Sequence, residues 1–227
     1  ETKAGKNDPV LSSGISLKSI VFNTSSTLTI ASGGSLTIDP NNLSGVGDYS
    51  ILIESGGAFI SSSANDFTIE SNFKSSSNGT IKTENSNCAI TINTNFDGPI
   101  NFDCVGNITL EANNEVNFET VKANTFTNKG TATVNTKLTS GTVTNNGTLT
   151  INGQAETGNL KNNSIVTITD VNELLISKKI DNLNGKIAGS VKLSGNNISS
   201  DSMHLGNDTS EYKNLTIDTH NEISFAG

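Results

Sequence analysis

One segment of the chain is written three times at a constant spacing of 17 residues, over positions 126–134, 143–151 and 160–168. Each copy opens on an apolar residue, carries Asn two positions later and closes on an aliphatic residue. The equivalent residues are Phe126, Val143 and Leu160, then Asn128, Asn145 and Asn162, then Val134, Ile151 and Ile168. A fixed period of this kind is typical of a solenoid, in which each repeat buries its apolar side only against its neighbours.

Apolar residues outside these copies occur in short dyads with period two, such as Leu28-Thr-Ile30, Ile90-Thr-Ile92 and Leu215-Thr-Ile217. This alternation is the signal of strands, and Thr and Val suit strands. With about 20 residues per coil, the 227 residues predict roughly ten to eleven coils. The expected fold is all-β, a parallel β-helix, and right-handed because parallel crossovers almost always are.

The early coils are expected to be longer than the later ones. Ile30 and Ile53 lie 23 residues apart, as do Leu36 and Phe59, whereas Phe59 and Ile81 lie 22 apart. We therefore expect these pairs to stack on consecutive coils. The Gly pairs between them, such as Gly56 and Gly57, suit tight corners that need a positive φ.

Stacking of the 17-residue copies predicts ladders along the axis. Val134, Ile151 and Ile168 are expected to point inward. Asn128, Asn145 and Asn162 are expected to form an amide ladder at a bend. A row of Thr133, Thr150 and Thr167 is expected on the outside. In domain terms, residues 1–18 are expected to be a cap or a disordered lead, and residues 19–227 a single β-helix.

Charge narrows the classes of partner. The net charge is −8, and all 14 basic residues are Lys. Nucleic acids and anionic membranes need clustered Lys or Arg, so neither is expected as a partner. A chain without Arg also lacks the bidentate guanidinium that clamps phosphate or carboxylate. The sequence has no apolar run near the roughly 20 residues of a transmembrane helix.

The two cysteines leave two interpretations open. Cys88 and Cys104 share the parity of inward residues and lie 16 residues apart, close to one coil. Stacked neighbours are near enough for a disulfide, and two buried free thiols are the alternative. His204 and His220 have no Cys or acid at metal-ligand spacing, so both are expected to be surface residues, and no metal or cofactor is expected.

Catalytic motifs are missing from the sequence. It has no Gly-x-Ser-x-Gly elbow, and its acids are dispersed rather than paired as glycoside hydrolysis requires. We therefore expect no enzyme. A polysaccharide-active solenoid stays open if Asp or Glu side chains face outward on adjacent coils beside a Lys. An ice-binding solenoid stays open if one flat Thr face runs along the rod.

The segment Asn145-Asn-Gly-Thr-Leu-Thr-Ile151, with Gly33-Gly-Ser-Leu-Thr-Ile38, resembles passenger domains of bacterial type V autotransporters and haemagglutinin-like adhesins. It is similar in composition to the rickettsial surface cell antigens. The resemblance implies a non-enzymatic virulence adhesin that is exported through the outer membrane by a C-terminal translocator β-barrel of the same precursor, which is not expected within these residues. It further implies display on the bacterial surface and contact with a host cell-surface protein or glycan. The segments 39–50, 61–66 and 194–214 are expected to be binding loops.

Overall fold

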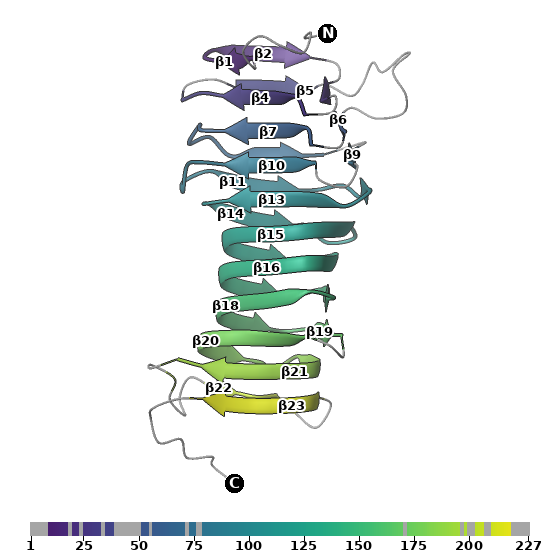
Figure 1. Cartoon of the computed structure of the whole chain (residues 1–227), viewed down its shortest axis with the longest axis vertical. Helices are drawn as coiled ribbons and strands as arrows, with labels where there is room; N and C mark the ends of the chain where they lie inside the picture. The colour runs from purple at the N-terminus through teal and green to yellow at the C-terminus, as the bar shows by residue number, and fades with distance from the viewer. Residues whose placement is uncertain are drawn as a thin grey trace.

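The chain winds into a parallel β-solenoid of about nine turns, seen in Figure 1 as a stack of coils with the termini at opposite ends. The computed structural model describes residues 9–17, 20–22, 25–32, 35–38, 51–54, 56–70, 73–75, 79–169, 172–195, 198, 203–206 and 210–218. All strand pairs in these residues are parallel, and none of these residues is helical. The expected parallel β-solenoid is therefore confirmed.

Three faces form the wall, and in the first coils each strand belongs to one of them. The first face holds β1 (Val10–Leu11), β4 (Thr27–Ile30), β7 (Ala58–Ser61), β10 (Thr80–Thr83) and β13 (Ile100–Cys104). The second face holds β2 (Gly14–Leu17), β5 (Ser35–Ile38), β8 (Phe67–Ile69), β11 (Ala89–Ile92) and β14 (Asn107–Leu110). The third face holds β3 (Ile20–Phe22), β6 (Ile51–Ile53), β9 (Phe73–Ser75) and β12 (Phe96–Asp97).

Longer strands in the later coils continue around a corner and contribute to more than one face. They are β15 (Glu115–Asn128), β16 (Thr131–Asn145), β18 (Gln154–Asn162), β20 (Glu173–Asp181), β21 (Lys186–Ser194) and β23 (Glu211–Asp218). The short strands β17 (Thr148–Ile151), β19 (Ile165–Ile168) and β22 (Met203–His204) complete these coils. Long strands form here because the corners between faces have shortened to one or two residues.

The 17-residue spacing becomes vertical stacking. Phe126 pairs in register with Val143, which pairs with Leu160. Thr131–Val134 of β16 lies on β17, which lies on β19 in the same register. Every residue of the inward column Val134, Ile151 and Ile168 is buried. Equal spacing in the chain thus places equivalent residues on consecutive coils, as the repeat predicts.

The expected stacking of the earliest dyads is wrong. Leu28, rather than Leu36, pairs with Phe59, at a spacing of 31 residues, and Leu36 pairs with Ile15. Ile53 lies on the third face and pairs with Phe22. The extra length lies between β5 and β6, so one early coil is longer than the spacing of 23 allowed. The spacing of 22 from Phe59 to Ile81 does stack. Longer coils also explain why the turns number about nine rather than the ten to eleven expected.

Coil pairing begins early in the chain. β1 pairs with β4, and β2 pairs with β5, so residues 10–17 already form part of the first winding. These residues lie inside the segment 1–18 that was expected to be a cap or a disordered lead. Residues 1–8 lie outside the described part of the chain.

A column of phenylalanines fills the core between the third, first and second faces. Phe73 stacks on Phe96 with ring centroids 4.1 Å apart and planes 22° apart. Phe102 and Phe118 meet edge to face at 5.5 Å, and Phe118 and Phe126 meet in the same way at 5.6 Å. All five rings are buried. Burial of each such side chain contributes about 1.5–3 kcal/mol, so this column stiffens the middle of the rod.

Candidate functional site

The structure brings Asn128, Asn145 and Asn162 together in one fully buried column at the end of the second face. Nδ2 of Asn128 donates to Oδ1 of Asn145 over 2.8 Å, and Nδ2 of Asn145 donates to Oδ1 of Asn162 over 2.8 Å. Each Nδ2 also donates to a backbone carbonyl of the following corner, of which Thr148 O at 2.9 Å is one. The column is therefore structural, because its polar atoms are turned into the wall and away from solvent.

A fourth amide extends this column beyond the repeat. Asn162 donates over 2.7 Å to Oδ1 of Asn182, which is also fully buried. Sequence reasoning missed Asn182 because it lies 20 residues after Asn162 rather than 17. At the other end, Leu110 precedes Asn128 in register, and Oδ1 of Asn128 has no donor among the described residues. The ladder thus has a direction, with one unpaired acceptor at its N-terminal end.

The two cysteines are buried free thiols in different columns. Cys104 pairs in register with Thr83 on the first face. Cys88 lies below Gly106, where an added Cβ would be 1.9 Å from Cys88 O. Burial raises the pKa of the Cys104 thiol to about 12 and, followed by the charge of Asp66, raises the pKa of Cys88. Since thiolates are the reactive form, neither residue is a nucleophile at neutral pH.

The remaining expected positions make no site. His204 is about half exposed, and its Nδ1 lies 3.5 Å from Oδ1 of Asp181. His220 and the segment 39–50 lie outside the described residues, as does part of the segment 194–214. The segment 61–66 is described, and Ser61 and Ser63 in it are buried. Across the part of the chain that the structure describes, no group of three His, Cys, Asp or Glu side chains could hold a metal ion.

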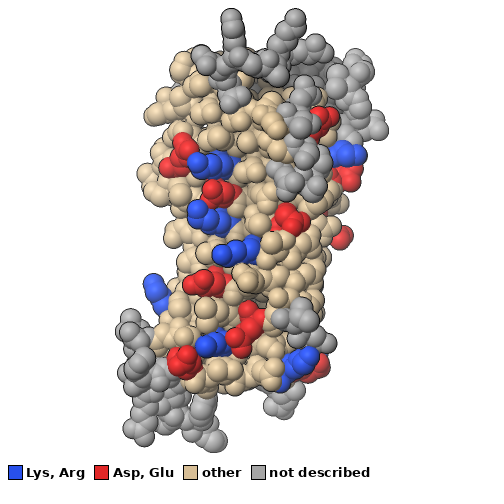
Figure 2. Space-filling model, in the orientation of Figure 1, with Lys and Arg blue, Asp and Glu red and all other residues tan. Residues whose placement is uncertain are grey.

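Charged side chains on the first face pair with one another across coils. Lys122 Nζ lies 2.8 Å from Asp103 Oδ1, and Lys82 Nζ lies 2.8 Å from Glu84 Oε1. The hydrogen bond between Lys82 and Glu84, reinforced by their opposite charges, raises the pKa of Lys82 and lowers the pKa of Glu84. Figure 2 shows Lys and acidic residues side by side along the rod, without a continuous patch of either sign on this face.

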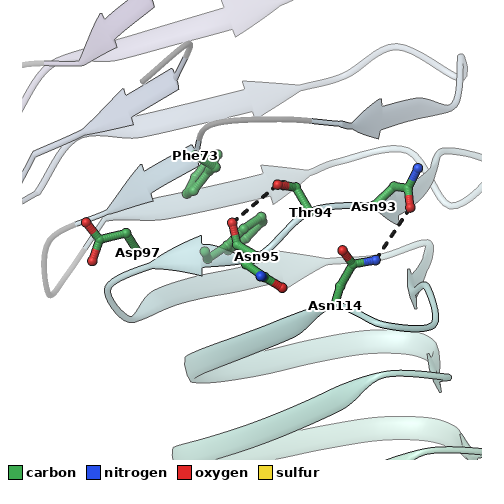
Figure 3. Close-up of a pocket in the computed structure, with 7 residues that line it drawn as sticks. Phe73, Asn93, Thr94, Asn95, Asp97 and Asn114 are labelled. Carbon is green, nitrogen blue, oxygen red and sulfur yellow. Dashed lines mark hydrogen bonds between the residues drawn. The ribbon is translucent and has the colours of Figure 1, made fainter. Parts of the chain in front are cut away.

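A pocket of about 570 Å³ lies at the corner between the second and third faces. It forms where the corner after β11 has three residues, 93–95, and the corner after β14 has four, 111–114. Figure 3 shows amide side chains from both corners at one end of the pocket and Asp97 at the other. The lining residues are Phe73, Asn93, Thr94, Asn95, Phe96, Asp97 and Asn114.

Hydrogen bonds fix the orientation of two of these amides. Oδ1 of Asn95 accepts the backbone N–H of Glu115 over 2.6 Å. Nδ2 of Asn114 donates to the carbonyls of Ala112 at 3.1 Å and Glu111 at 3.3 Å, and to Oδ1 of Asn93 at 3.4 Å. Asn95 Nδ2 and Asn114 Oδ1 are left to face a ligand. Phe73 and Phe96, nearly fully buried, belong to the core column and hold the floor in place.

Sequence reasoning missed the pocket because no motif marks it. The segment 93–95 follows an ordinary strand dyad, Ile90-Thr-Ile92, and reads as a polar turn. The only local signal is that the corner before residue 115 is longer than the Asn-Gly corners that follow it. Corner lengths become visible only once the register of the coils is known.

The second face carries a row of outward threonines that the sequence analysis also missed. We call Thr68, Thr91, Thr109, Thr127 and Thr144 the threonine column, because each pairs in register with the next. Lys161 follows Thr144 and ends the column. The expected row on the third face, Thr133, Thr150 and Thr167, also lies in one register. It is preceded by Asn117 and followed by Ala188.

Comparisons of the chain with protein-family models, curated proteins and solved structures found no match. Among the described residues, no helix has the length and apolar character needed to cross a membrane. The arguments for function therefore rest on the solenoid and on the surfaces described above.

Proposed function

We propose that this solenoid is a non-enzymatic binding segment of a bacterial surface adhesin, which contacts a host cell-surface protein or glycan. In this proposal the chain is the passenger part of a precursor exported through the outer membrane by a translocator barrel elsewhere in that precursor. Two features support it: the parallel solenoid fold and the resemblance of the repeat to autotransporter passengers. A solenoid carries surfaces away from a cell on a stiff wall, because each coil packs on the next.

The pocket at residues 93–97 and 114 is the single observation that carries the proposal. It is concave, it lies on a buried Phe floor, and its rim offers fixed amide groups rather than a reactive side chain. Preformed concave sites with a few oriented polar groups are typical of ligand binding. Its position at a corner of the rod leaves it open to a large partner.

The acidic residues favour binding over catalysis. Glu84 and Asp103 do face outward on adjacent coils beside Lys82 and Lys122, the pattern that a polysaccharide-active solenoid would need. However, a glycosidase acid must have a raised pKa, and the pKa of Glu84 is lowered by Lys82 and by the hydroxyl of Ser62. The two carboxylates are engaged in ion pairs, and none of these residues lines the pocket.

Binding of the purified, fluorescently labelled chain to cultured animal cells tests the proposal. Saturable binding that excess unlabelled chain displaces is the expected result. Binding that is absent or rises linearly with concentration, without displacement, would contradict it. Incubation with neutral and acidic polysaccharides, followed by measurement of reducing ends and of new double bonds, tests the enzymatic alternative, and product formation would favour it.

The threonine column supports ice binding as a second candidate. Parallel strands repeat about every 4.8 Å, so the column presents a regular row of hydroxyl and methyl groups that could order water. Freezing-point hysteresis of the pure chain is the measurement. If this candidate holds, Thr127→Lys abolishes the hysteresis, and the matched substitution Thr150→Lys on the third face leaves it intact. Absence of hysteresis removes the candidate.

A further inference from the structure

We propose that the pocket at the corner between the second and third faces binds a neutral saccharide. This inference deepens the proposed function, because it names the ligand class of the same site. It rests on three features of the pocket: the hydrogen-bonding groups that remain available, the charge of the rim and the shape of the floor.

The available groups are one donor and one acceptor on adjacent coils. Asn95 uses Oδ1 to accept the N–H of Glu115, so its Nδ2 is presented as a donor. Asn114 uses Nδ2 for two carbonyls and Asn93, so its Oδ1 is presented as an acceptor. Neither Asn95 Nδ2 nor Asn114 Oδ1 has a protein partner among the described residues. Neighbouring sugar hydroxyls each donate and accept, so they match such a fixed pair.

The charge of the rim selects a neutral ligand. The pocket lining includes Asp97 and no cation. The nearest Lys that pairs with this rim is Lys74, whose Nζ lies 3.3 Å from Asp97 Oδ2, so its charge is already opposed. Sulfated or sialylated sugars would bring a negative charge next to a carboxylate on a chain of net charge −8. A carboxylate is, by contrast, a good acceptor for hydroxyl groups.

The floor and the volume suit a small ring. Phe73 and Phe96 stack at 4.1 Å and belong to the rigid core column, so the floor is apolar and preformed. The C–H groups of a sugar ring can lie on such a surface. A volume of about 570 Å³ falls within the range of sites for small ligands. A preformed site does not lose affinity by ordering itself on binding.

An array that carries neutral oligosaccharides beside their sulfated and sialylated counterparts tests the ligand class. The wild-type chain is expected to bind neutral members and to bind their anionic counterparts more weakly. The best neutral sugar is then titrated calorimetrically against two variants. Asn95→Asp keeps the acceptor for Glu115 N–H and removes only the donor. Asn146→Asp is the matched control, since Asn146 occupies the position of Asn93 three coils on, outside the pocket.

Asn95→Asp is expected to weaken binding by about tenfold, the effect of one lost hydrogen bond, at an unchanged melting temperature. Asn146→Asp is expected to stay within about twofold. Preference for anionic sugars, or equal losses in both variants, would overturn the inference, as would an array without any bound sugar. If the chain still binds cells saturably in that last case, the proposed function stands and only the ligand class fails. If cell binding is absent as well, both fail.

Discussion

The side-chain amide of Asn128 donates a 2.8 Å hydrogen bond to Oδ1 of Asn145, 17 residues later in the chain and one coil away. Both residues are fully buried, and the same contact recurs between Asn145 and Asn162 and between Asn162 and Asn182. A buried polar group stabilises a fold only when its partners are present. The spacing of the chain and the register of the coils are therefore tied together by these amides.

Asn145→Leu is expected to destabilise the protein by about 2–5 kcal/mol. The substitution leaves Oδ1 of Asn162 and the carbonyl of Ile165 without their donor, and each orphaned buried group costs about 1–3 kcal/mol. Asn128→Leu is expected to cost less, because Oδ1 of Asn128 already lacks a donor. Urea unfolding followed by circular dichroism measures both. Equal losses would contradict the direction assigned to the ladder.

Gly147→Ala is expected to destabilise the protein although Gly147 does not have a positive φ. A Cβ at Gly147 would lie 2.0 Å from the carbonyl oxygen of Gly130 in the previous coil, so the two coils must separate locally. Overpacking of this kind typically costs about 1–3 kcal/mol. The next coil has Ser164 at the equivalent position, and Ser164→Ala is the matched control with little effect. Thermal unfolding compares the two, and similar melting temperatures would contradict the steric argument.

Phe102→Ala is expected to cost about 3–5 kcal/mol, because it leaves a cavity in the middle of the aromatic column. Phe102 is fully buried between Phe96 and Phe118. Val105→Ala on the same coil is the control, since Val105 is 43% exposed and loses little contact. Denaturant unfolding measures both. A loss below about 1 kcal/mol for Phe102→Ala would show that the coils close around the cavity.

Stability is expected to fall as the pH rises above about 9. Burial raises the pKa of Cys104 from 9.0 to about 12. The unfolded chain therefore loses the thiol proton at lower pH than the folded chain does. The stabilising effect of the buried thiol is complete below pH 9 and declines as the pH rises toward 12. Urea titrations between pH 8 and 11 measure the change, and Cys104→Ala should flatten it. An equal slope in this variant would assign the effect to other groups.

Both thiols are expected to resist modification in the folded state. Cys88 and Cys104 are buried, and the pKa of each is raised, so little thiolate is present at pH 8. Ellman's reagent should label neither residue in buffer and both in denaturant. Rapid labelling in buffer would contradict the buried positions, and a failure to label in denaturant would indicate a disulfide.

Much of the fold was predictable from the sequence, but its register was not. The copies around Asn128, Asn145 and Asn162 have nearly identical length, so constant spacing gave the right stacking there. In the early chain the dyads are alike and the corners vary. Leu36 and Leu28 were equally good partners for Phe59 by pattern, and the pairing with Leu28 needs a coil of 31 residues. Alternation with period two reports which face is buried but carries no information on coil length.

The sequence by itself determined a parallel solenoid, its inward columns and the amide ladder, because a direct repeat can bury its apolar residues only by stacking. The tertiary structure alone decided which corners lie next to each other. It therefore decided that Asn95 and Asn114 share a pocket rim and that five threonines separated by unequal spacings form one column. Those relationships depend on the summed lengths of the intervening corners, and corner length is a property that short-range pattern does not encode.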